Sequence, residues 1–307
     1  MTRRSRIVLW LIVALFALFN VYTSLAPDLL PAGSVGIINT VFLVVFALVH
    51  GAALYGLGGI VVFVILCLVV GNIFENTSIL TGFPFGHYHY SGVLGAKVFL
   101  VPVTIGGAYF GAGYLSWTVA CVLLGRTSRP FDRFVQWAIP VVASFLMTSW
   151  DFMLDPLAST VDHYWIWENG GGFFGVPLTN YLGWLLTVFI FYALFSAYHR
   201  RVVTKSGSVV ARFSRSFWAA PLAMYGLLSI RYILIFFATP SNSRVVDAAG
   251  HAWMLRDIQE TAALVAIFTI LDFSGASAGR YAKRNDDIVQ PCNPGWSSHV
   301  LSWRFAF

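Results

Sequence analysis

Two carboxylates close one apolar run of the chain, IPVVASFLMTSWDFMLDP. Asp151 and Asp155 are four residues apart, so they share one face if the helix continues to Pro156. Two acids that are close together and partly removed from water do not both ionise readily, so one keeps its proton. A retained proton is what a general acid requires. We therefore predict that this pair donates a proton, the alternative being a pair that caps the helix end or binds Arg231.

Two further acids stand beside long apolar stretches. Glu75 ends the run GGIVVFVILCLVVGNIFE, and Glu168 opens the glycine-rich stretch ENGGGFFGVPLTN, which ends in Asn180. An ionisable group at the depth of Glu75 is costly and is usually functional. We add Glu75 and Glu168 to the Asp pair as candidate catalytic acids.

Arg231 lies well inside another apolar run, LLSIRYILIFF. An unpaired guanidinium there would be very costly. The nearest carboxylates by depth are the acids just described. We predict that Arg231 forms a structural ion pair with one of them.

Two segments are rich in glycine, proline and aromatic residues. One follows Glu75 and the other begins at Glu168. The first segment spans 82–95 and contains GFPFGHYHY, and the second spans 168–184. Such segments cannot be continuous helices. Irregular backbone at membrane depth persists only where it lines a cavity or is buried in protein. We predict two re-entrant or interfacial lids over one pocket.

The walls of the predicted pocket are aromatic. We take as substrate-binding candidates Trp150, Tyr88, Tyr90, Trp165, Trp167, Phe174, Asn180 and Trp184. The two segments and their flanks also supply Phe83, Phe85, Tyr164, Phe173 and Tyr181. Aromatic faces stabilise a positive charge, which beside buried acids suits carbocation chemistry on a lipid-soluble substrate. The alternative is an interfacial aromatic belt.

The elements that must position these residues are membrane helices. Of 307 residues, 58% are hydrophobic and 10% are charged, against roughly 25% charged in soluble domains. A spanning helix needs about 20 mostly apolar residues, and about eight such runs lie near 7–25, 35–54, 57–75, 97–124, 134–152, 178–198, 217–238 and 257–273. The second and third are divided by a tight turn at Gly56, Gly58 and Gly59. The sequence predicts an all-α polytopic bundle, with one domain over 1–284 and a disordered cytoplasmic tail over 285–307.

The basic residues sort to one side of the predicted membrane. With the N-terminus inside, all of the 19 Lys and Arg except Lys97, Arg231, Arg244 and Arg256 face the cytoplasm. This distribution predicts a multi-pass protein of the cell membrane with both termini cytoplasmic, and it explains the net charge of +6 without nucleic acid. The first run has an alternative as a secretory signal, because three arginines precede it and Ser24-Leu25-Ala26 is a tolerable cleavage site.

The sequence lacks the motifs that several kinds of chemistry require. The seven histidines are scattered, with none of the boxes that di-iron oxygenases need, and no phosphate-binding or dinucleotide-binding motif occurs. The three cysteines have no metal or redox spacing. We predict no metal site, although His87 and His89 could bind a metal together with Glu75.

The combination of motifs resembles a known family. The residues that carry the resemblance are Glu75, GFPFGHYHY (82–90), Leu94-Gly95, Val101-Pro102, Asp151, Leu154-Asp155-Pro156, Tyr164-Trp165-x-Trp167, Gly175-Val176-Pro177, Asn180 and Gly183-Trp184. They resemble the membrane carotenoid-biosynthesis family of CruF-type carotenoid 1,2-hydratases, which includes bisanhydrobacterioruberin hydratase. The matching segments run from about 70 to 190, somewhat over a third of the chain.

The resemblance implies an enzyme that adds water to the terminal C1–C2 double bond of an acyclic (psi) carotenoid end without a cofactor. The product is a tertiary 1-hydroxyl, and the partners are a lipid-soluble carotenoid, water, membrane lipid and other enzymes of the pathway. The sequence pI near 9.3 favours gamma-carotene or lycopene over a bacterioruberin precursor. In this scheme the Asp151/Asp155 pair gives the proton, Glu75 or Glu168 positions or deprotonates the water, and Asn180 orients it.

Two other functions fit the same residues. A transporter or non-catalytic membrane protein could use the broken segments as a gate, but it would need a polar path that the inner halves of the spans, Asp272 apart, do not supply. A carotenoid cyclase or isomerase would use the same acid and aromatic groups while excluding water.

Overall fold

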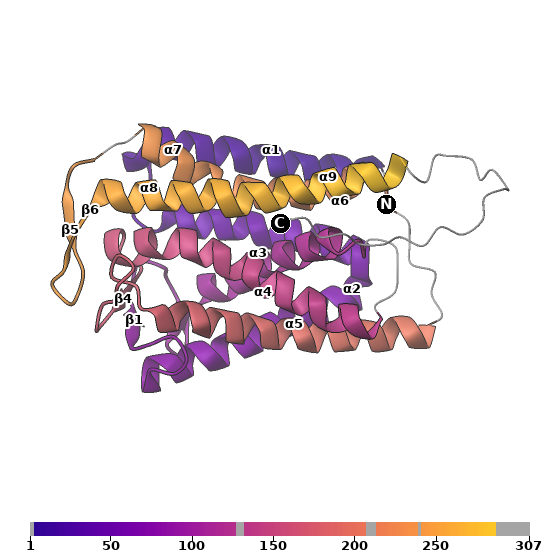
Figure 1. Cartoon of the computed structure of the whole chain (residues 1–307), viewed down its shortest axis with the longest axis horizontal. Coiled ribbons are helices and arrows are strands. Elements are labelled where there is room, and N and C mark those ends of the chain that lie inside the picture. The colour runs from indigo at the N-terminus through magenta and orange to yellow at the C-terminus, as the bar shows by residue number, and fades with distance from the viewer. Residues whose placement is uncertain (1–2, 127–131, 207–212, 239–240, 287–307) are drawn as a thin grey trace, which may run out of the picture.

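The computed structural model describes residues 3–126, 132–206, 213–238 and 241–286. Its helices run along the long axis of the molecule, and strands β1, β4, β5 and β6 gather at the left-hand end in Figure 1. We call this the strand end. The predicted all-α helical bundle is confirmed, while most of the predicted tail lies outside the described residues.

The helices follow the apolar runs of the sequence. They are α1 (Arg3–Leu25), α2 (Ser34–Thr81), α3 (Val103–Leu123), α4 (Arg133–Asp155), α5 (Leu178–Ser206), α6 (Arg215–Leu227), α7 (Ile230–Ala238), α8 (Leu255–Val265) and α9 (Asp272–Asp286). A 3-10 turn covers Pro27–Leu29, and π-helical turns cover Pro156–Val161 and Ala266–Leu271.

The long helix α2 folds back on itself at Gly56. Gly56 has φ 71° and ψ 168°, a conformation that suits only glycine. A Cβ added to Gly51 would lie 2.4 Å from Ile60 Cδ1, although nine residues of straight helix would separate these positions by about 13.5 Å. The predicted division of this stretch into two spans is therefore confirmed.

Six helical stretches of the described chain are long and apolar enough to cross a membrane. They are Ser5–Leu25, Ser34–Thr81, Arg133–Val161, Leu178–Val202, Arg215–Ala238 and Leu255–Gly279. The folded α2 supplies two of the eight predicted runs, and α3 supplies another that is not among the six. Helix α3 also begins later than the run at 97–124, because Lys97–Val98 (β2) and Val101–Pro102 (β3) form a hairpin first.

Helix α4 carries the Asp pair and ends in a wide turn. It continues to Asp155, as predicted, and becomes π-helical over Pro156–Val161. Pro156 has no N–H with which to continue the α-helical hydrogen bonds, and single π-turns of this kind are frequent at functional sites. The Asp162 N–H instead bonds to Leu157 O at 2.8 Å.

The first glycine-aromatic segment pairs with the strand that directly precedes the second segment. Strand β1 (Tyr88–Tyr90), from the first segment, runs antiparallel to β4 (Trp165–Trp167), next to the second. Tyr88 lies opposite Trp167, and Tyr90 opposite Trp165. Because alternate residues of a strand point to the same face, all four rings face the inside of the protein, where they are buried. The pairing thus brings the two predicted lid segments to the same end of the bundle.

A second hairpin covers the second segment. Its strands are β5 (Arg244–Val246) and β6 (Ala252–Met254), and Asp247 holds the turn between them. Asp247 accepts from Trp253 Nε1 at 2.9 Å and from the His251 N–H at 2.9 Å. A Cβ on Gly175 would lie 3.0 Å from Asp247 Cβ, so the turn packs directly on the glycine-rich backbone.

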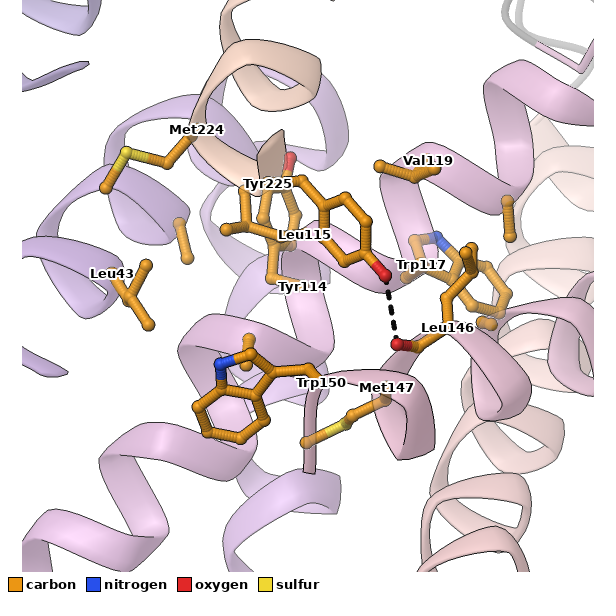
Figure 2. Close-up of a cluster of buried hydrophobic side chains, with 14 of the residues drawn as sticks. Leu43, Tyr114, Leu115, Trp117, Val119, Leu146, Met147, Trp150, Met224 and Tyr225 are labelled. Carbon is orange, nitrogen blue, oxygen red and sulfur yellow. Dashed lines mark hydrogen bonds between the residues drawn. The ribbon is translucent and has the colours of Figure 1, made fainter. Parts of the chain in front are cut away.

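The core of the bundle lies beneath the strand end. Figure 2 shows Tyr225 of α6 donating to Leu146 O of α4 at 3.0 Å, among buried side chains of α2, α3, α4 and α6. Leu43 and Trp150 belong to this core and also line the cavity described below. The floor of the site is therefore part of the close-packed interior, which holds its side chains in place.

Candidate active site

A cavity of about 300 Å³ opens between the helices at the strand end. It is lined by α1, both arms of α2, α3, α4, α5, α7 and α8 and by strands β1 and β4. The predicted site residues in its wall are Glu75, Tyr88, Tyr90, Trp150, Asp151, Asp155, Trp165, Trp167, Asn180, Trp184 and Arg231. The remaining wall is largely apolar, as expected for a lipid-soluble ligand.

Asn180 of α5 bridges the two aspartates of α4. Its Nδ2 atom donates to Asp151 Oδ2 at 2.9 Å and to Asp155 Oδ2 at 2.6 Å. All three side chains are at least 98% buried. The two carboxyl groups therefore lie side by side in a low-dielectric place, held by one amide.

Asp155 has both oxygens occupied by hydrogen bonds. Trp165 Nε1 donates to its Oδ1 atom at 2.8 Å, and Trp167 Nε1 approaches the same atom at 3.4 Å. These indoles come from β4, so the paired strands fix this acid directly. Asp155 is thus fixed in the cavity wall as a hydrogen-bond acceptor.

Asp151 keeps one oxygen free. Its Oδ1 atom accepts no hydrogen bond from the residues that the structure describes, and it is not among the polar atoms that are sealed in protein without a partner. Since Asp151 lines the cavity, Oδ1 faces the cavity. It is the carboxyl oxygen of the pair that can reach a ligand.

Glu75 sits in a cage of three tyrosines. Tyr109 donates to Oε1 at 2.7 Å and Tyr90 donates to Oε2 at 2.7 Å, while the Tyr88 hydroxyl makes a short hydrogen bond to Oε2. Burial and the neighbouring Glu75 charge raise the pKa of Tyr88 and of Tyr90 well above the usual value. Both phenols therefore remain hydrogen-bond donors, and the cage is suited to an anionic acceptor.

Aromatic faces close the cavity around the acids. Trp184 stacks on Tyr109 with ring centroids 4.7 Å apart and an angle of 11°. Trp150 meets Trp184 edge-on at 6.4 Å, and Tyr88 lies 4.8 Å from Trp167. Electron-rich rings beside buried acids give the cavity a wall that stabilises a cation.

Two predicted site residues lie elsewhere. Glu168 follows β4 at a position that alternates with Trp167, so it points outward, where its side chain is 52% exposed and contacts His89 at 3.3 Å. Phe174 has φ 51° in the glycine turn, and its ring packs against Trp253 at 5.4 Å. Neither lines the cavity, so the structure does not bring these two residues together with the acids.

Arg231 lines the cavity without the predicted ion pair. Within the described chain, no carboxylate oxygen lies at ion-pair distance from it, and its Nη1 atom donates to Thr23 Oγ1 at 3.3 Å. Its charge acts on Asp162, at the end of the π-turn. The acids that were expected to bind Arg231 are instead occupied by Asn180, by indoles and by phenols.

The alternative metal site with Glu75 does not form. Strand alternation places Tyr88 and Tyr90 inward, while His87 and His89 are exposed. Glu75 and the two histidines are therefore on opposite sides of β1.

Sequence reasoning missed two phenols that face the site, Tyr109 of α3 and Tyr232 of α7. Both lie within apolar runs, where a tyrosine gives no signal different from that of a structural aromatic. Tyr232 stands next to Arg231, and this adjacency is the only hint of its place that the sequence contains.

These features define a polytopic helical membrane protein with an acid-lined cavity under paired aromatic strands. The model of the family described as carotenoid biosynthesis protein matches residues 33–241. The chain belongs to this family, and the predicted resemblance is confirmed at that level. The match includes Glu75, the Asp pair, Asn180 and Arg231, and it implies a role in carotenoid biosynthesis with a lipophilic substrate in a membrane. The chain matches no curated protein and no solved structure.

Proposed function

We propose that this protein is a carotenoid hydratase that adds water across the terminal C1–C2 double bond of an acyclic carotenoid end. The observation that carries the proposal is Asp151 Oδ1, a free carboxyl oxygen that faces an aromatic cavity while every other oxygen of the three acids is hydrogen-bonded. A protonated carboxyl in that position can protonate an alkene.

The first step is proton transfer from Asp151 to C2. The π electrons of the double bond form the new C2–H bond, and a tertiary cation remains at C1. Two adjacent carboxyl groups in a buried place favour a shared proton, so the Asp151/Asp155 pair is suited to hold one. Asn180 and the Trp165 indole hold Asp155 as the neighbouring acceptor, which places the proton on Asp151.

The second step is capture of the cation by water. The faces of Trp150 and Trp184 and the anionic Glu75 stabilise the charge at C1. A water lone pair forms the C1–O bond, and the surplus proton of the oxonium passes to the Asp151 carboxylate. The acid is then restored and the net change is the addition of one water molecule.

The cavity fits one end of such a substrate. Its volume of about 300 Å³ is at the lower limit for sites that enclose a drug-sized ligand. A forty-carbon polyene would place its end group in the cavity and the remainder among the helices and lipid. We place the protein in the cell membrane with both termini cytoplasmic, as the distribution of basic residues predicts.

The test is the pigment profile of a bacterial host that makes lycopene or gamma-carotene and expresses this chain in heavy-oxygen water. A new pigment that is heavier by one water and carries the heavy oxygen supports hydration. A cyclised or isomerised pigment without the label would instead favour a cyclase or isomerase. An unchanged profile with both polyenes would contradict the proposal, and a host expressing Asp151→Asn serves as the matched control.

A further inference from the structure

The Tyr232 hydroxyl is a polar group of the cavity that the mechanism above does not use. Tyr232 lines the cavity from α7, and its hydroxyl makes no hydrogen bond with the described residues. It differs in this from Tyr88 and Tyr90, which donate to Glu75. It also differs from Tyr181, whose hydroxyl is sealed in protein without a partner. No described residue therefore occupies the Tyr232 hydroxyl, which belongs to a residue of the cavity wall.

Several other polar side chains that line the cavity already have hydrogen-bond partners in the protein. Asn20 and Asn39 exchange reciprocal hydrogen bonds of 2.9 and 3.1 Å between α1 and α2. Thr40 donates to Gly36 O at 2.9 Å, and Arg231 donates to Thr23. Tyr232 lies within electrostatic range of both Asp151 and Arg231. Tyr232 and the proton donor Asp151 thus line the same cavity.

We propose that the Tyr232 hydroxyl positions the water that captures the cation. The inference rests on the proposed hydration and adds to it a residue that decides what becomes of the cation. The attacking water directs a lone pair at C1, so its two hydrogens need acceptors. The Tyr232 oxygen accepts one and the Asp151 carboxylate, having given up its proton, accepts the other. Arg231 has only donors and cannot take either role.

Water held in this way changes the outcome and not the protonation step. Without a positioned water, the cation loses a proton and returns to an alkene. Loss from C2 regenerates the substrate, and loss from a methyl group on C1 gives a shifted double bond. In deuterated water the exchangeable acid delivers deuterium to C2, so recovered alkene that carries deuterium records protonation without capture. The ratio of alcohol to deuterated alkene therefore measures water capture alone.

The test compares wild type with Tyr232→Phe in membranes that contain the full chain, supplied with lycopene in deuterated water. Removing a hydroxyl without a protein partner leaves the packing unchanged, and the deuterium signal shows in the same sample that the acid still works. We expect the alcohol-to-deuterated-alkene ratio to fall about tenfold or more, in line with the loss of an oriented reactant. Tyr22→Phe, on an exposed side chain of α1, is the control and should keep the wild-type ratio.

An unchanged ratio in Tyr232→Phe overturns the assignment, whether both signals persist or both fall together. A fall in both would mean that the residue supports the acid or the fold. Absence of alcohol and of deuterium in the wild type, with both polyenes, would instead remove the proposed hydration, and this inference with it.

Discussion

Asp151 and Asp155 lie one turn apart on α4, and their Oδ2 atoms stand 2.9 and 2.6 Å from the same nitrogen of Asn180. The difference between them lies in the second oxygen. That of Asp155 is held by indoles, whereas that of Asp151 faces the cavity without a partner. The carboxyl groups of Asp151 and Asp155 are chemically identical, but their surroundings give them different roles.

This inequality predicts unequal effects of the two amide substitutions. Asp151→Asn should lower hydration about a thousandfold, because it removes the proton donor. Asp155→Asn should lower hydration by about ten- to a hundredfold, because the donor remains but loses its neighbouring carboxyl. The measurement is alcohol formed per amount of protein in membranes.

Glu168→Gln is the control for both substitutions. Glu168 is half exposed and outside the cavity, so this variant should keep wild-type activity. Normal hydration by both Asp variants, or a larger loss in Asp155→Asn than in Asp151→Asn, would contradict the assigned roles.

Helical spacing made the Asp pair predictable, because residues four apart share a face wherever the helix continues. Strand alternation could have predicted more. In the stretch WIWE, the burial of Trp165 and Trp167 implies that Ile166 and Glu168 point away. Treating the stretch as an irregular lid hid this alternation, and Glu168 was placed in the site as a result.

The cage around Glu75 could not be predicted in full. The repeat HYHY placed two of its tyrosines, whereas Tyr109 comes from α3 and reaches Glu75 only through the packing of α3 against α2. The same holds for Arg231, whose predicted partners are engaged by groups from four different elements. Hydrogen-bond competition of this kind depends on three-dimensional packing, and local sequence does not encode it.

The tyrosine cage predicts that Glu75 acts as an anion. Glu75→Gln offers one acceptor oxygen to three phenol donors, so buried donors lose their partners at a cost of about 1–3 kcal/mol. We expect a lower thermal midpoint in detergent and a loss of hydration of at least about tenfold, because the cation at C1 loses its counter-charge. Tyr109→Phe removes one donor and keeps the charge, so it should affect hydration less. Equal activity of Glu75→Gln and wild type would rule out the anionic role.

Close packing of the first segment on α5 depends on Gly183. A Cβ at this position would lie 2.5 Å from Phe85 Cδ1 and 3.0 Å from the backbone carbon of Pro84. Gly183→Ala should therefore displace the first segment. It should also displace Asn180, which lies about one helical turn before Gly183, and so lower both the thermal midpoint and hydration. Gly172→Ala is the matched control, since nothing lies within 4 Å of its added Cβ. Similar behaviour of the two variants would show that this contact does not position the site.

The Asp247 turn predicts a response to acid. Burial alone would raise the pKa of Asp247, but hydrogen bonds from Trp253 and from the His251 backbone and ring outweigh it and hold the pKa below the ordinary value. A folded-state pKa below the unfolded value, about 3.9, means that the ionised acid stabilises the fold above that pH. This stability is lost as the pH falls through the folded-state pKa.

We expect the wild-type thermal midpoint in detergent to drop as the pH is lowered below about 4. The drop should be smaller in Asp247→Asn, because this variant lacks the titrating group and has a lower midpoint already at neutral pH. Glu260→Gln, which changes an exposed acid of α8, is the control and should show the wild-type dependence of the thermal midpoint on pH. If the midpoints of Asp247→Asn and wild type ran parallel at every pH, the turn would not depend on this charge.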